Sequence, residues 1–247
     1  MRRPRLIMVL LAGGLVLLAA AVLLSTQPAS AAGGRSASTP MGGWRYTENA
    51  APVSTGRVVS LYIDRDFDDF ERQRIVSAMR QWNYVLNGFV QFRARMLPDD
   101  PSRTMLAQIR RSGGWVVARV DSRHGVAQQG EGKQALAVTT GGNGGFVYVI
   151  SDRIGNRDLT GVVMHEFGHV LGAGHDERSG LMAPVYNPAM GRCIDRDSVS
   201  LVAQAQRLPL NRLNWCVGPG DDPSRTPMVQ GPVRYDDYRN PMAARQR

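Results

Sequence analysis

The stretch HEFGHVLGAGHD, residues 165–176, holds three of the four histidines in a chain of 247 residues. Residues four positions apart lie on the same face of a helix, so His165 and His169 can offer imidazole nitrogens to one point. A third histidine six residues later would leave that face if the helix continued. Gly172 provides a residue at which the chain can turn and bring His175 back. The spacing therefore predicts a helix that ends at a three-histidine metal site.

The chemistry of this site follows from the ligand set. Three neutral imidazoles leave the fourth position of a zinc ion to water, which is the arrangement of a catalytic zinc. Glu166 follows the first histidine directly and can reach that water without displacing it. It can take the proton of the water during attack on a carbonyl and pass it to the leaving amine. The sequence thus predicts one catalytic Zn²⁺ held by His165, His169 and His175, with Glu166 as general base in amide hydrolysis.

These residues resemble the H-E-x-x-H-x-x-G-x-x-H motif of the metzincin zinc endopeptidases, and within them the matrixins. The resemblance implies a methionine in a tight turn beneath the metal. Met182 fits that place, since Gly180 and Pro184 frame it just after the third histidine. It also implies that Pro184 and Tyr186 form a wall of the substrate pocket. Ordinary core packing of Tyr186 is the alternative.

The resemblance further implies a strand at the edge of a sheet that pairs with an extended peptide substrate. The segment that we assign to it is Leu136, Ala137 and Val138, with an interior strand as the alternative. The implied fold class is α+β, a metzincin-like zincin fold. It combines a twisted mixed β-sheet, a long backing helix, the active-site helix and a small C-terminal subdomain after the methionine turn.

Hydrophobic periodicity predicts the secondary structure around this site. Alternation and β-branched residues predict five strands, at residues 57–64, 89–96, 115–120, 134–139 and 146–151. Spacings of three and four residues predict three helices, at residues 66–86, from about 158 through the histidine motif, and at 197–208. The glycine-rich run TGGNGG, residues 140–145, separates the last two strands and is predicted to be a loop.

The chain divides into four segments. Residues 1–32 have a basic start, an apolar run and a small-residue Ala29-Ser30-Ala31 site, as in a signal peptide; an uncleaved N-terminal anchor is the alternative. Residues 33–55 are predicted to be a flexible leader and 56–216 the metalloprotease domain. The Pro-, Gly- and Arg-rich residues 217–247 are predicted to be a disordered tail. We therefore expect a secreted or extracytoplasmic protein, with a membrane anchor only if the first segment is retained.

The two cysteines, Cys193 and Cys216, are predicted to form a disulfide in that oxidising environment, with two buried thiols as the alternative. The formal net charge of +9 comes almost wholly from scattered arginines, which does not favour nucleic-acid binding. His124 lacks the H-x-D pattern with which matrixins hold a second zinc. Calcium occurs in the family, but no dense carboxylate loop assigns a site.

The predicted function is therefore an exported, zinc-dependent endopeptidase that acts as a monomer on protein or peptide substrates. The alternative is a non-catalytic, zinc-containing extracellular binding module. Glu166 argues against the alternative, because a structural zinc would not need this carboxylate.

Overall fold

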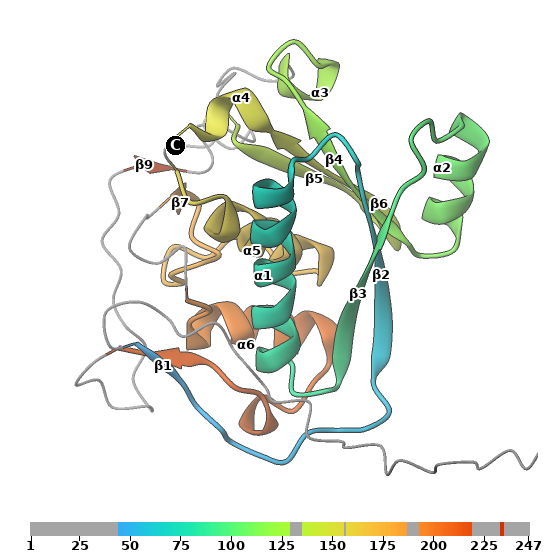
Figure 1. The fold of residues 1–247 in the computed structure, drawn as a ribbon. Coiled ribbons are helices and arrows are strands. Elements are labelled where there is room, and N and C mark those ends of the chain that lie inside the picture. Colours follow the sequence, from blue (N-terminus) through green and yellow to red (C-terminus); the bar gives the residue numbers. More distant parts are fainter. Residues whose placement is uncertain (1–43, 129–134, 156, 187–192, 219–232, 235–247) are drawn as a thin grey trace, which may run out of the picture. The chain divides into compact units, whose positions relative to one another are not determined.

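The computed structural model describes residues 44–128, 135–155, 157–186, 193–218 and 233–234 (Figure 1). The predicted signal segment, residues 1–32, lies outside these residues, as does most of the tail predicted for residues 217–247. All elements below belong to one compact unit, residues 35–247. In the part of the chain that is described, none of the helices combines the length and the hydrophobicity that a bilayer crossing requires.

A five-stranded mixed sheet forms the centre of the fold. Its strands are β2 (Arg57–Ile63), β3 (Val90–Met96), β4 (Trp115–Val120), β5 (Ala137–Gly142) and β6 (Gly144–Ile150). The order across the sheet is β3-β2-β4-β6-β5. The strands β3, β2, β4 and β6 run parallel to one another, and β5 runs antiparallel to β6. With the helices packed on it, this sheet confirms the predicted α+β, metzincin-like fold class.

The long backing helix, α1 (Asp69–Val85), begins at a reciprocal cap. Asp68 accepts a hydrogen bond from the backbone N–H of Glu71, and the Glu71 side chain accepts one from the N–H of Asp68. The cap sets the start of the helix three residues later than the predicted residue 66. Ile75 and Trp82 are fully buried on the inner face of the helix, as the predicted periodicity requires.

The two helices that cover the same face of the sheet are tied to each other. α5 (Leu159–Val170) lies behind α1 in the view of Figure 1. The indole Nε1 of Trp82 donates a hydrogen bond to the backbone oxygen of Met164 at 2.8 Å. Both residues are buried, so this bond satisfies polar atoms that water cannot reach. It fixes the long helix against the helix that carries the histidine motif.

One helix was missed by the sequence patterns. α2 (Arg103–Arg111) connects β3 to β4 and begins at Ser102, whose hydroxyl accepts a hydrogen bond from the N–H of Met105. Its residue Ile109 packs with Leu97 and Val116 on the opposite face of the sheet from α1. Two sequence features do indicate this helix, namely the capping residue Ser102 and the spacing of the apolar residues. Both are weak indications, because the helix is short and mostly polar.

The glycine-rich run at residues 140–145 was predicted to be a loop, and this prediction is wrong. The run forms the closed end of a β-hairpin. The ladder between β5 and β6 continues through this run until Gly142 faces Gly144. Gly144 has a φ of +94°, and a Cβ at this position would lie 2.4 Å from the backbone oxygen of Arg110. Glycine is required here because the chain turns tightly and packs against backbone.

The remaining elements are short, apart from α6. They are β1 (Arg45–Tyr46), α3 (Gly125–Gln128), α4 (Ser151–Ile154), β7 (Val185–Tyr186), α6 (Arg196–Gln206), η2 (Leu210–Arg212), β8 (Cys216–Val217) and β9 (Val233–Arg234). β7 pairs with β9, so the backbone of two residues in the predicted tail is paired with the segment after the methionine turn.

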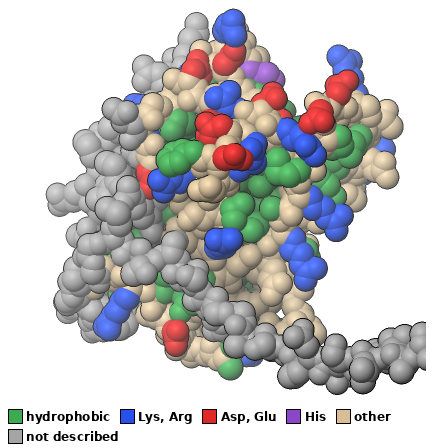
Figure 2. All heavy atoms as spheres, viewed as in Figure 1, with side chains coloured by type: hydrophobic (Ala, Val, Ile, Leu, Met, Phe, Trp, Pro, Cys, Tyr) green, Lys and Arg blue, Asp and Glu red, His purple; other side chains and the backbone are tan. Residues whose placement is uncertain are grey.

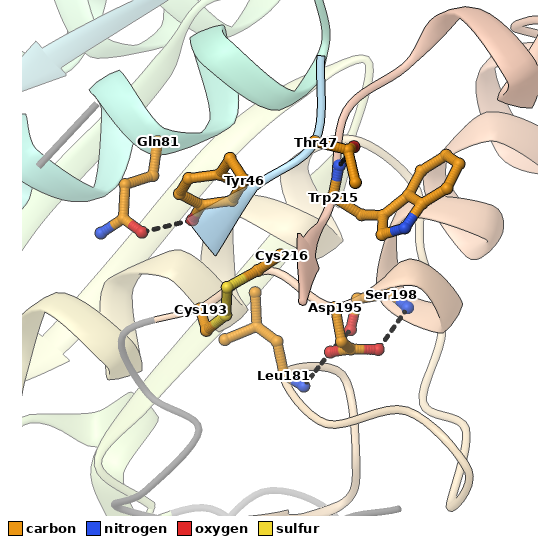
Figure 3. Close-up of a disulfide and its surroundings, with 9 residues drawn as sticks. All are labelled: Tyr46, Thr47, Gln81, Leu181, Cys193, Asp195, Ser198, Trp215 and Cys216. Carbon is orange, nitrogen blue, oxygen red and sulfur yellow. Dashed lines mark hydrogen bonds between the residues drawn. A yellow bond between two sulfur atoms is a disulfide. The ribbon is translucent and has the colours of Figure 1, made fainter. Parts of the chain in front are cut away.

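The C-terminal subdomain is closed by the disulfide between Cys193 and Cys216, which confirms the predicted pair (Figure 3). Since the bridge spans 23 residues, it limits the freedom of the unfolded chain and contributes about 3 kcal/mol to stability. It joins the residues just before α6 to β8. The two ends of the segment that contains α6 are therefore held together.

The second half of the predicted leader, residues 44–55, packs on the domain instead of remaining free. β1 pairs with β8, and the Tyr46 hydroxyl donates a hydrogen bond to Gln81 Oε1 at 2.5 Å (Figure 3). Burial raises the pKa of the Tyr46 hydroxyl. The composition of this segment suggested flexibility, but Tyr46 gives it an anchor and β8 a strand partner. Residues 33–43 lie outside the described residues.

Candidate metal centre

The histidine motif lies on the second half of α5 and in the turn that follows it. Asp158 caps the helix by accepting a hydrogen bond from the N–H of Thr160. The helix ends where Gly172 adopts a φ of +87°. This left-handed conformation is unfavourable for other residue types, and it directs the chain back toward the helix face that carries His165 and His169. The predicted role of Gly172 is thus seen in the backbone.

Three imidazole nitrogens converge at this turn. The Nε2 atom of His165 lies 3.0 Å from Nε2 of His169 and 3.2 Å from Nε2 of His175. His165 is buried, His169 partly exposed and His175 exposed, so the group opens to solvent on one side. Among the residues that the structure describes, these three form the one cluster of His, Cys, Asp or Glu side chains able to hold a metal.

Backbone carbonyls hold two of the rings from behind. Nδ1 of His165 lies 2.6 Å from the oxygen of Leu181, and Nδ1 of His169 lies 2.7 Å from the oxygen of Ala173. A carbonyl can only accept, so each Nδ1 carries the proton and each Nε2 presents its lone pair. This is the tautomer that a metal ligand requires.

The donor set fits zinc. Nitrogen ligands about 2.0–2.1 Å from a tetrahedral zinc lie about 3.3–3.4 Å from one another, close to the spacings seen here. Imidazole is a preferred zinc ligand, and three of them leave one position open. The described residues contain no second group of three or more His, Cys, Asp or Glu side chains close enough to hold an ion, so no calcium site is assigned. Zinc is therefore the ion for which this site is suited.

Glu166 lies beside the cluster and is fully buried. Its Oε2 accepts a hydrogen bond of 2.6 Å from the hydroxyl of Thr139, on edge strand β5. The same hydroxyl lies 3.3 Å from the backbone oxygen of Glu166. Thr139 therefore limits the rotation of the carboxylate. No sequence pattern predicted this contact, because its partners are 27 residues apart and lie on different elements.

Met182 packs against the active-site helix, and its predicted role as the floor beneath the metal stays a prediction. Its side chain is fully buried, and a Cβ added to Gly168 would lie 2.3 Å from the Met182 sulfur. Gly168 stands between Glu166 and His169 in the motif. The missing Cβ allows the thioether to pack directly against the helix backbone.

A buried carboxylate holds the methionine turn in place. Asp195 Oδ2 accepts a hydrogen bond of 2.7 Å from the N–H of Leu181, and Asp195 also caps α6 (Figure 3). The hydroxyl of Ser198 donates to Asp195 and accepts from the N–H of Met182 at 3.1 Å. Leu181 in turn supplies the carbonyl behind His165. The Asp-x-x-Ser pattern predicts a helix cap, but only the fold connects it to the metal centre.

The surface turn after His175 is ordered by a local ion pair. Arg178 donates hydrogen bonds to the carboxylate of Asp176, and this contact lowers the pKa of Asp176. The backbone N–H of Asp176 also donates to the oxygen of Met182 at 3.1 Å. Asp176 therefore joins the third histidine to the methionine turn.

The structure describes four of the five predicted substrate-pocket residues with their side chains. β5 is an edge strand, so Ala137 and Val138 lie where an extended peptide could pair, and Leu136 directly precedes them. Leu136 and Ala137 are buried, whereas Val138 is partly exposed. Pro184 is buried next to β7. The side chain of Tyr186 lies outside what the structure describes, so its role in the pocket stays a prediction.

Comparisons with known proteins place this geometry in context. A family model described as matrixin, of the peptidase M10 type, matches residues 69–204. One similar solved structure is high choriolytic enzyme 1 (HCE-1), a hatching enzyme zinc-protease from the medaka fish Oryzias latipes, at 20% identity and a TM-score of 0.31. That match covers 51% of this chain and 50% of the other, so the chain spans about half the length of that structure. No curated protein matches the sequence.

We expect the Gly168→Ala variant to be destabilised and to bind zinc more weakly. Alanine normally favours a helix by up to about 1 kcal/mol over glycine, but here its Cβ would overlap the Met182 sulfur and cost about 1–3 kcal/mol. Chemical denaturation and competition with a chromophoric chelator measure the two effects. Gly125→Ala is the matched control, since its Cβ would enter open space. Equal stability and zinc affinity in the two variants would contradict the close packing.

The Asp195→Ala variant is expected to lose about 2–4 kcal/mol of unfolding free energy. It removes a helix cap and leaves the buried N–H of Leu181 without its acceptor. Asp68→Ala removes a cap from α1 but touches no part of the methionine turn, and should lose only about 1 kcal/mol. Denaturation curves of both variants, recorded with zinc, provide the comparison. Equal losses would mean that Asp195 acts only as a cap.

Proposed function

The chain belongs to the matrixin peptidase family, and on this premise we propose that it is an exported, zinc-dependent endopeptidase. The observation that carries the proposal is the convergence of three imidazole Nε2 atoms beside the buried carboxylate of Glu166. His165, His169 and His175 are the proposed ligands. When bound, zinc lowers the pKa of a coordinated water toward about 7 and polarises the substrate carbonyl.

Glu166 is the proposed general base and acid. The hydrogen bond from Thr139 to Oε2 restricts the carboxylate, so that proton transfer does not require reorientation of the side chain. In the proposed reaction Glu166 accepts a proton from the attacking water and delivers it to the amine nitrogen of the leaving group. Both transfers use the same residue, which explains why one buried carboxylate is sufficient.

The substrate is proposed to bind as an extended peptide along β5. An edge strand presents backbone N–H and C=O groups that a peptide can pair with, independently of its sequence. Pro184 and Tyr186 are proposed to shape the pocket for the side chain after the cleaved bond. Because Thr139 lies on β5 and contacts Glu166, the proposed peptide strand would pass next to the general base.

Export is proposed from the character of residues 1–32. The disulfide between Cys193 and Cys216 supports this proposal, because such bonds persist mainly in oxidising compartments.

The first test is cleavage of a diverse unfolded peptide mixture by the purified protein, read by mass spectrometry. We expect cuts that disappear when a chelator removes the metal and return when zinc is added. The residues on either side of the cuts would show what the pocket accepts. Folded, zinc-loaded protein that cuts nothing would instead favour a binding module.

The Glu166→Ala variant is expected to keep its zinc and to lose kcat/KM by about 10²–10⁴-fold or more, because proton transfer loses its carrier. Metal content and kcat/KM on a cleaved peptide measure the two properties separately. Glu48→Ala removes an exposed carboxylate away from the site and should leave both unchanged. Normal turnover by Glu166→Ala would remove this residue from the mechanism.

We expect the Thr139→Val variant to lose about 10–100-fold in kcat with little change in KM. Valine has the shape of threonine but cannot donate to Glu166, and a hydrogen bond to a charged group contributes about 1.5–3 kcal/mol. Thr139→Ser keeps the hydroxyl and should restore most of the loss. Equal kcat values for the valine and serine variants would show that the hydroxyl does not position Glu166.

A further inference from the structure

The opposite edge of the sheet carries a groove that the proposed catalysis does not use. β3 is the last strand on that side, and the space between it and α1 is a groove of about 690 Å³. We call this the β3 groove. The lining residues on which the argument rests are Phe70, Arg74, Arg80, Ala94, Arg95 and Met96.

The backbone of β3 faces this groove at every second residue. Toward β2, the oxygen of Phe89 accepts from Arg57, and the N–H of Leu97 donates to Ile63. Peptide groups alternate in direction along a strand, so the odd-numbered residues between 89 and 97 face β2 and the even-numbered ones face outward. The outward direction at residue 92 is seen directly, since both peptide groups of Phe92 bond to the side chain of Asn83.

Asn83 therefore imitates a neighbouring strand at residue 92, and only there. The next outward-facing residue is Ala94, which lines the β3 groove, followed by Met96. An extended segment could continue the pattern that Asn83 begins by pairing with Ala94. The groove thus offers a strand-pairing position next to one that the chain fills itself.

The side chains around this position are apolar and positively charged. Phe70 is 60% exposed and Met96 is 41% exposed, and they are two of three large exposed hydrophobic residues in the described part of the chain. Figure 2 shows hydrophobic side chains gathered on the face over α1 and β3, with arginine side chains around them. Such a patch is typical of an interaction surface.

The charged residues of the groove are mostly positive. Four arginines and one aspartate line it, and the aspartate, Asp69, is paired with Arg72. Arg74 lies over the ring of Phe70. Across the described ranges, no carboxylate lies within salt-bridge distance of Arg80 or Arg95. These two exposed arginines flank the open part of the strand and are available to acidic groups.

We propose that the β3 groove binds an extended acidic segment of a partner protein as an added strand on β3. Backbone groups of the segment pair with Ala94. Because side chains alternate along a strand, carboxylates of the segment can meet Arg80 on the α1 side of the sheet and Arg95 on the other side. An apolar side chain of the segment packs on Phe70 and Met96. A second copy of this chain is a poor occupant, since it would bring like charge, with a net charge of +9 per copy. β3 and β5 are opposite edges, so this binding is separate from the proposed binding of substrate.

The test uses a fluorescein-labelled nine-residue peptide of alternating Glu and Val as the probe. The protein is the full chain with Glu166→Ala, so that the probe is not cut. We expect saturable binding in fluorescence anisotropy that weakens with salt. A Lys-Val peptide of the same length should bind at least about tenfold more weakly, because it lacks negative charge. The Glu-Val peptide with N-methyl groups on alternate residues should be weakened as much, because it lacks the backbone N–H groups that pair with β3.

Variants locate the binding. Arg80→Glu with Arg95→Glu should weaken the probe at least about tenfold. Arg103→Glu with Arg111→Glu, the same charge change on exposed residues of α2, should change it less than about threefold. Amide exchange at residue 94 should slow when the probe binds, while exchange along β5 should not change.

Three results would overturn the proposal. One is absence of binding at millimolar probe, which would mean that the arginines only protect the strand edge from pairing. Another is a wrong location of binding, seen either as equal binding by both pairs of variants or as protection from amide exchange on β5 instead of β3. The third is self-association of the chain that the Arg80 and Arg95 substitutions abolish, which would assign the groove to a second copy.

Discussion

The convergence of three imidazole nitrogens is the constraint on which the rest of the structure depends. Nitrogen lone pairs 3.0–3.2 Å apart repel one another unless a cation lies between them, so the rings must be held from behind. The carbonyls of Leu181 and Ala173 supply that support for two of them. Each carbonyl must in turn be fixed, which extends the constraint from the helix into the C-terminal subdomain.

The methionine turn carries this constraint outward. Leu181 holds His165 with its oxygen and is itself held through its N–H by Asp195. Asp195 caps α6 and lies two residues from the disulfide that ties the subdomain to β8. Met182 packs against Gly168 from below. The geometry of the ligands is thus maintained by buried hydrogen bonds and packing that join segments distant in sequence.

The sheet gives its two edges different environments. β5 contacts the active-site helix through Thr139, and none of its own six residues carries a charge. β3 lies beside α1 and is surrounded by arginines, with part of its edge covered by Asn83. An exposed strand edge invites pairing, and its side chains decide which partners it accepts. The sheet can therefore carry one proposed binding surface at β5 and another at β3 without overlap between them.

By itself, the sequence determined the three-histidine cluster and most of the secondary structure. The spacing of His165 and His169, the turn at Gly172 and the alternating strands are local properties that a short window of residues contains. The helix α2 and the packed residues 44–55 were missed because their local signals are weak. Only the tertiary structure decided how the rings are held, what touches Glu166 and which strands are edges. These depend on contacts such as Thr139 with Glu166 or Leu181 with Asp195, which exist only after distant segments have packed together.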